Sequence, residues 1–123
     1  MTEQTTPRFA GWKVAVLTSL HAVCWAAAFP PFGLWPLAMV SLAPLAVAAI
    51  RAERRRILVI WTFLSSSIGW AVLNLWVGEI SGAGLPAMAM YLACWTVLAA
   101  LCLRRLAHRR RFGRLPLALL LPI

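Results

Sequence analysis

The sequence has few charged residues and very few acidic ones. Charged side chains make up 12% of the 123 residues, with 3 Asp+Glu against 12 Lys+Arg, whereas 63% of the residues are hydrophobic. A soluble domain is typically about 45–50% apolar and about 25% charged. The composition therefore excludes an ordinary soluble domain and intrinsic disorder, and the length leaves room for one folding unit. With so much apolar sequence, the formal net charge of +9 indicates a membrane protein whose cations lie in short loops.

The motifs of common catalytic and metal sites are also missing. The cysteines number 3, an odd count without a CxxC pair or a His/Cys cluster, so neither a disulfide framework nor a zinc site is predicted. No GxSxG, P-loop or dinucleotide fingerprint is present. Cys24, Cys94 and Cys102 lie within hydrophobic stretches, where packing is favoured over a nucleophilic role. We therefore predict no catalytic residue, no cofactor site and no metal site in this chain.

Four hydrophobic stretches are long enough to cross a bilayer as helices. A hydrocarbon core about 30 Å thick requires roughly 20 helical residues. The sequence therefore predicts an all-α membrane protein whose spans pair as two helical hairpins, and these spans are Trp12–Phe29, Phe32–Ile50, Ile57–Val77 and Leu85–Leu103.

A fifth apolar stretch begins at Leu115 and is still apolar at Ile123. It is too short to cross a bilayer, so we expect a chain cut within its fifth helix; a natural terminus in the membrane interface is the alternative. The predicted organisation is a cytoplasmic amino-terminal tail over residues 1–11 and a transmembrane domain over residues 12–123, with the truncated fifth span at 115–123.

The basic residues all fall on one side of this arrangement. With the amino terminus inside, the outer segments Pro30-Pro31 and Gly78–Pro86 contain no Lys or Arg. The positive-inside rule therefore predicts a cytoplasmic amino terminus. Anionic phospholipid headgroups are the expected partners of the inner loops, rather than nucleic acid, because loops pinned at the bilayer cannot track a duplex. The inner cations are Arg8, Lys13, Arg51, Arg54, Arg55, Arg56, Arg104, Arg105, Arg109, Arg110, Arg111 and Arg114.

Polar residues within the third span are candidates for lipid contact or helix packing. Ser67, Trp70 and Asn74 follow one another at i+3 and i+4 and so share a helix face, and Trp76 lies just beyond them. This face could line a cavity for a lipid headgroup, but hydrogen bonds between helices are the favoured interpretation.

Other residues in or beside the spans have simpler expected roles. Ser65 and Gly69 form a small-xxx-small pair that would let another backbone approach closely. His21 lacks an acidic partner in any span, so a hydrogen bond to a neighbouring helix is favoured over a proton relay. Glu79 is interpreted as a solvated loop charge.

A turn is expected between the first two spans. Pro30-Pro31-Phe32-Gly33 should end the first helix, because proline lacks an amide donor and biases the residue before it away from helix.

This turn also carries a family resemblance. The run from Ala28 to Ala38, AFPPFGLWPLA, with Leu42-Ala43-Pro44-Leu45 after it, resembles the start of bacterial apolipoprotein N-acyltransferases. The later order is similar too: a basic loop, a Gly-rich turn ending in Leu85-Pro86, Tyr91 near the start of the fourth span, and a basic loop before LPLALLLP. Residues 74–78, Asn-Leu-Trp-Val-Gly, are less aromatic than the corresponding stretch of that family.

The resemblance implies the amino-terminal membrane-anchoring part of an enzyme of the bacterial inner membrane. In that family a periplasmic nitrilase-like domain, which follows further membrane helices, carries a Glu–Lys–Cys triad. The cysteine of the triad takes an acyl chain from a phospholipid and passes it to the amino-terminal cysteine of a diacylated lipoprotein. The resemblance assigns no triad residue to this chain, which would be inactive alone and meet the lipoprotein only in the full-length enzyme. The alternative is a complete small four-helix membrane protein, either a transporter or an accessory subunit.

Overall fold

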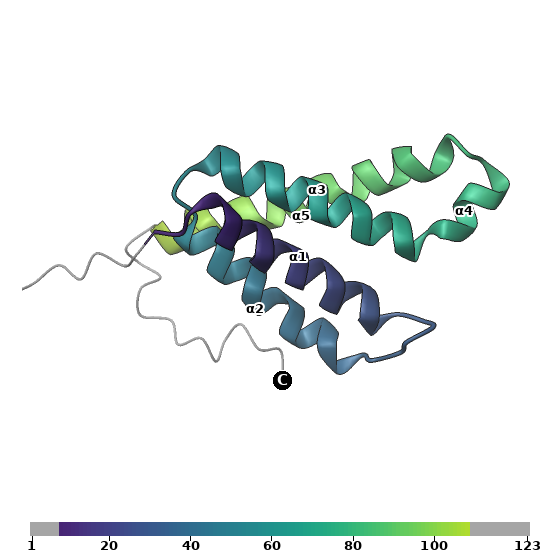
Figure 1. Cartoon of the computed structure of the whole chain (residues 1–123), viewed down its shortest axis with the longest axis horizontal. Helices are drawn as coiled ribbons and strands as arrows, with labels where there is room; N and C mark the ends of the chain where they lie inside the picture. The colour runs from purple at the N-terminus through teal and green to yellow at the C-terminus, as the bar shows by residue number, and fades with distance from the viewer. Residues whose placement is uncertain (1–7, 109–123) are drawn as a thin grey trace, which may run out of the picture.

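The computed structural model describes residues 8–108, and within them the chain forms five helices and no strand (Figure 1). The predicted all-α fold class is thus confirmed. The predicted span at 115–123, the basic residues at 109–114 and most of the amino-terminal tail lie outside the described residues. The helices are α1 (Gly11–Ala28), α2 (Pro36–Arg51), α3 (Arg55–Leu73), the short α4 (Leu75–Ile80) and α5 (Gly84–His108).

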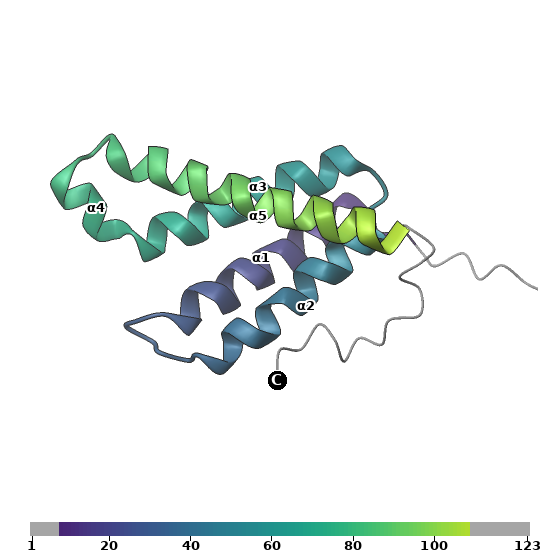
Figure 2. The same ribbon diagram turned by 180° about the vertical axis from the view of Figure 1, so that it is seen from behind.

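The four long helices pair as two hairpins. Helix α1 packs on α2, and α3 packs on α5, while α1 against α3 and α2 against α5 hold the hairpins together. Figures 1 and 2 show the hairpins close together at one end and separated at the other, where α4 and the turn between α1 and α2 lie. The closed end holds the start of α1, the α2–α3 connection and the end of α5.

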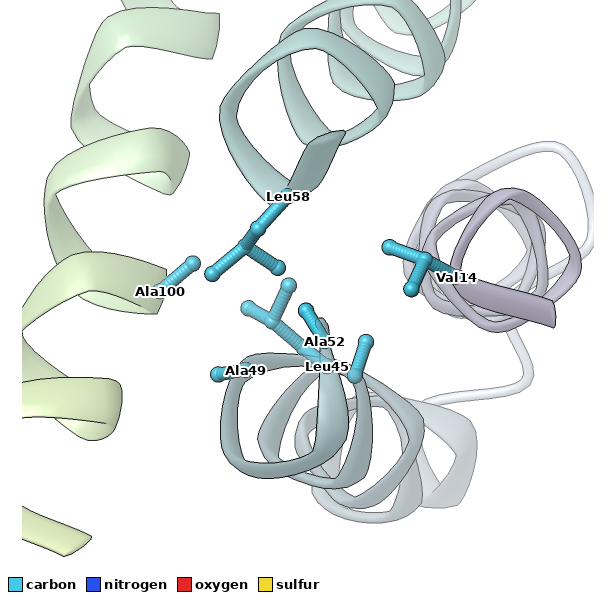
Figure 3. Close-up of a cluster of buried hydrophobic side chains, with 7 residues drawn as sticks. Val14, Leu45, Ala49, Ala52, Leu58 and Ala100 are labelled. Carbon is cyan, nitrogen blue, oxygen red and sulfur yellow. The ribbon is translucent and has the colours of Figure 1, made fainter. Parts of the chain in front are cut away.

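Small side chains fill the buried core at the closed end. Val14 of α1, Leu45 and Ala49 of α2, Leu58 of α3 and Ala100 of α5 point toward one another (Figure 3). Alanines allow the helices to approach closely, and close packing is the main attraction between helices in lipid. Large apolar side chains instead cover the outside, among them Trp12, Trp35, Ile68, Ile80 and Trp95. An apolar exterior around a core of small residues suits a lipid environment.

Two helices among residues 8–108, α3 and α5, are long and apolar enough to cross a membrane. Helix α2 is apolar but has 16 residues, which span about 24 Å at 1.5 Å per residue, less than the hydrocarbon core. Helix α1 has 18 residues and includes Lys13 and His21, both of which lower its hydropathy. The spans predicted at Trp12–Phe29 and Phe32–Ile50 therefore stay predictions.

Three helices differ clearly in extent from the predicted spans. Helix α5 continues to His108, beyond the predicted end at Leu103. Helix α2 begins at Pro36 rather than Phe32, because the chain first completes a turn and proline then occupies the first helical position. The expected span Ile57–Val77 is interrupted at Asn74, whose backbone is not helical. Helix α3 therefore ends at Leu73, and α4 follows as a separate turn of helix.

The turn between α1 and α2 is built around two prolines and a glycine. Helix α1 ends at Ala28, and Pro30 and Pro31 have no amide hydrogen with which to extend it. The amide of Gly33 donates to the Phe29 carbonyl at 3.1 Å. Gly33 has a φ of 63°, in the left-handed region that favours glycine.

Candidate functional site

A cleft of about 230 Å³ lies between the two hairpins and is lined by all four long helices. Its walls are mainly apolar and include His21 and Trp25 of α1, Leu45 of α2, Trp70 of α3 and Thr96 of α5. The cleft is therefore a property of the assembled bundle rather than of one hairpin.

Tryptophans form one wall of the cleft. The ring of Trp25 meets the ring of Trp70 edge-on, with centroids 6.0 Å apart, and meets Phe29 at 5.4 Å. The indole N–H of Trp70 donates to the Thr96 hydroxyl at 3.4 Å, which links α3 to α5 across the cleft. Aromatic pairs of this kind hold their rings in defined positions, so the wall has a fixed shape.

His21 joins α1 to α2 beside the cleft. Its side chain is only 6% exposed, and its Nδ1 lies 2.7 Å from the carbonyl oxygen of Ser41. A carbonyl oxygen can only accept, so Nδ1 carries a proton and donates. The hydrogen bond to a neighbouring helix that the sequence favoured for His21 is present.

Two polar atoms in the cleft walls have no hydrogen-bond partner within the described part of the chain. They are the indole nitrogen of Trp25 and the hydroxyl oxygen of Ser66, a residue that is 3% exposed. Unpaired buried polar groups are costly, and more so in lipid. Both atoms are buried beneath the wall, so the surface that the cleft presents is mainly apolar.

The candidate residues of the third span occupy different surroundings. Trp70 lines the cleft, whereas Ser67 is half-buried with a hydroxyl that has no partner among the described residues. The side-chain amide of Asn74 donates to the Trp70 carbonyl at 2.8 Å, and the same carbonyl accepts from the Asn74 backbone amide at 3.1 Å. Trp76 lies on α4 and is 59% exposed. Only Trp70 of these four side chains reaches the cleft.

The turn residues Pro30, Pro31 and Gly33 are exposed at the end of the first hairpin and do not line the cleft. Phe32 lines a second groove, between α1 and α3, which is about 470 Å³, mainly apolar, and shares Ala22 and Gly69 with the cleft. The turn therefore sets where α2 starts and places one aromatic ring beside a groove between the two hairpins.

The sequence interpretation missed Trp25, Ser66 and Thr96. A signal was available for Trp25, because it follows His21 at i+4 and so lies on the same face of α1. Ser66 and Thr96 gave no such signal, since a serine or threonine in an apolar helix is ordinary. Within residues 8–108, no three His, Cys, Asp or Glu side chains form a group that could hold a metal ion.

Residues 21–123 match the family model described as the apolipoprotein N-acyltransferase N-terminal domain. No curated protein and no solved structure matches the chain. The matched segment begins at His21 and includes every residue named above in the walls of the cleft.

Proposed function

The chain belongs to the apolipoprotein N-acyltransferase family, and from this membership we propose that residues 12–123 form the amino-terminal membrane domain of such an enzyme. In the complete enzyme an acyl chain passes from a phospholipid to the amino-terminal cysteine of a diacylated lipoprotein. The family match over residues 21–123 carries this proposal. The domain anchors the enzyme in the bacterial inner membrane, and catalysis belongs to the nitrilase-like domain.

The proposed topology places the closed end of the bundle in the cytoplasm, with four spans above it. Three basic segments, at residues 8–13, 51–56 and 104–108, meet at that end. The amide of Phe9 donates to the Arg51 carbonyl at 2.7 Å, and the Arg104 guanidinium donates to the Ala52 carbonyl at 2.8 Å. A concentration of cations at one end supports an inward orientation and contact with anionic headgroups.

The cleft gives the membrane domain a second proposed role, which is to admit an acyl chain of the donor phospholipid from the side. Leu42 and Trp95, which line the cleft, are 44% and 58% exposed, so its apolar walls continue onto the outer surface of the bundle. An acyl chain entering there would meet mainly apolar side chains.

The topology is tested by labelling single cysteines. Ser81→Cys and Ala107→Cys are introduced separately into a chain without Cys24, Cys94 and Cys102. Both positions are exposed, so their reactivity reports the side of the membrane. A membrane-impermeant thiol reagent applied to intact cells should label position 81 and not 107, whereas both should react after permeabilisation. Labelling of position 107 alone in intact cells would refute the orientation.

The assignment of catalysis to another domain predicts that the 123-residue chain has no acyltransferase activity. Reconstituted with phospholipid and a diacylated lipopeptide, it should yield no N-acylated product and trap no thioester, because the family's nucleophile belongs to the nitrilase-like domain. Mass spectrometry of the lipopeptide measures the product, and a full-length family member in the same vesicles is the positive control. Acyl transfer that persists after removal of full-length enzyme would place the chemistry within this chain.

A further inference from the structure

We propose that a groove at the closed end of the bundle, between the start of α3 and the end of α5, binds the phosphate of an anionic phospholipid. The groove has a volume of about 710 Å³, and its walls include Arg55, Leu98, Leu101, Cys102, Arg105 and His108. It shares no lining residue with the cleft between the hairpins. The proposal rests on the membrane placement proposed above, and it concerns a structural lipid distinct from the acyl donor.

The face of α5 that lines the groove changes from apolar to basic along the helix. Leu98, Leu101, Arg105 and His108 follow one another at spacings of three and four residues, so they share one face. From Leu98 to Arg105 the helix rises about 10 Å at 1.5 Å per residue. An amphiphile lying along this face would place its apolar part beside the leucines and its anionic group beside the cations.

The available positive charge comes from both sides of the groove. Arg55 is the first residue of α3 and Arg105 lies near the end of α5, and both are exposed. The guanidinium of Arg104, which also lines the groove, is already engaged by the carbonyls of Ala49 and Ala52 at 3.3 and 2.8 Å. Among the described residues, Arg55 and Arg105 are therefore the arginines left to meet a phosphate, and none of the described residues that line the groove is acidic.

The first turn of α3 adds to this charge. The side chain of Arg54, at the N-cap position, makes no capping hydrogen bond to the helix. Uncapped amides at a helix N-terminus carry partial positive charge and attract anions. The start of α3 therefore adds positive potential next to Arg55. The leucines that also line the groove favour a lipid phosphate over a soluble one.

The test compares two pairs of substitutions that remove the same charge. Arg55→Gln with Arg105→Gln removes the two cations of the groove, whereas Arg54→Gln with Arg56→Gln removes two exposed cations that do not line it. The purified chain is placed in nanodiscs of phosphatidylcholine containing phosphatidylglycerol, and lipid retained on the protein is measured by native mass spectrometry. All variants must unfold at the same temperature in phosphatidylcholine alone.

We expect the wild-type chain to retain one phosphatidylglycerol in preference to phosphatidylcholine. A cation that hydrogen-bonds directly to a phosphate contributes at least about tenfold, so the groove pair should lose about 100-fold in preference. The control pair should lose less than about threefold at 0.15 M salt, because charges that do not touch the phosphate are screened. Equal losses from the two pairs would overturn the site in favour of diffuse attraction.

Further measurements distinguish a lipid phosphate from a soluble one, and a failure of the lipid site from a failure of the proposed membrane domain. Glycerol 3-phosphate at millimolar concentration should not displace the lipid, and displacement by it would overturn a lipid site in favour of a soluble anion. Arg105→Lys keeps the charge, so this variant should still retain phosphatidylglycerol.

Carbonate extraction tests membrane integration separately. Release of the chain by carbonate would contradict the proposed membrane domain, whereas an integrated chain without preference for phosphatidylglycerol would contradict only the lipid site.

Cys102 supplies an independent readout, because its thiol lines the groove and is exposed. In detergent micelles, added phosphatidylglycerol should slow modification of Cys102 by N-ethylmaleimide. Cys94, also exposed on α5 but outside the groove, is the internal control and should react at an unchanged rate. Equal protection of both thiols, or of neither, would argue against a lipid bound in this groove.

Discussion

Replacing Gly69 with leucine is expected to destabilise the bundle by about 1–3 kcal/mol, more than any effect of replacing the nearby Asn74. Gly69 lies where α3 crosses α1. A Cβ atom at this position would come 3.3 Å from the Cβ of Ala22 and 3.6 Å from its carbonyl oxygen. The first contact is tighter than ordinary van der Waals packing, so α1 and α3 would have to move apart before the rest of a leucine was accommodated.

Asn74→Leu is the contrasting variant. It removes one hydrogen bond, from the side-chain amide to the Trp70 carbonyl at 2.8 Å. A hydrogen bond inside a membrane averages about 0.6 kcal/mol, and removal of a polar group that is costly in hydrocarbon offsets part of that loss. Resistance to unfolding by sodium dodecyl sulfate measures both variants. Gly82→Leu is the matched glycine control, because no atom of residues 8–108 lies within 4 Å of a Cβ built there.

An Asn74→Leu variant that unfolds more easily than Gly69→Leu would show that polar contacts outweigh close packing in this bundle. If Asn74 instead contacts lipid, its replacement in the full-length enzyme should reduce acyl transfer while leaving resistance to unfolding intact. The two measurements therefore separate a packing role from a lipid-contact role for this residue.

Close approach by α3 could be anticipated from the sequence, but its partner could not. The spacing of Ser65 and Gly69 predicts a small surface on one face, and such a surface is available to whichever helix packs there. The structure places Ala22 of α1 against Gly69. Ser65 makes its hydrogen bonds within its own helix, to the carbonyls of Trp61 and Thr62 at 2.7 and 3.3 Å.

Hydropathy predicted that the helices exist but misjudged the start of α2 and the ends of α3 and α5. It averages over a window, so the apolar residues Phe32 and Leu34 read as part of a span although they belong to the turn before Pro36. The break at Asn74 depends on one side chain that bonds to the preceding turn of α3. Local hydrogen bonding of this kind competes with helix continuation and leaves hydropathy unchanged.

The cleft itself could not be predicted, because it depends on pairings between distant parts of the chain. His21 and Ser41 are 20 residues apart and meet only when α1 and α2 pack. Trp70 and Thr96 are 26 residues apart and meet only across α3 and α5. The spacing of Ser67, Trp70 and Asn74 predicts that they share one helix face, but it does not predict which helix packs against that face.

Arg104→Met is expected to destabilise the bundle by about 1.5–3 kcal/mol, because the Arg104 side chain connects α5 to α2 by hydrogen bonds. Its guanidinium donates to the carbonyls of Ala49 and Ala52, at 3.3 and 2.8 Å. These carbonyls lie at the end of α2, where the helix offers no further amide donors. Methionine keeps much of the apolar stem but removes both hydrogen bonds, so α5 would lose its polar connection to α2.

Arg105→Met is the matched control, since Arg105 is exposed, is the next residue of α5 and carries the same charge. Unfolding is measured in a neutral detergent without anionic lipid, so that a phosphate bound at Arg105 does not contribute. Arg105→Met should then unfold like the unmodified chain, and Arg104→Lys should be intermediate, because an ammonium keeps the charge but lacks the planar donor geometry of arginine. Equal losses from Arg104→Met and Arg105→Met would mean that net charge at the closed end, rather than the two hydrogen bonds to α2, holds the hairpins together.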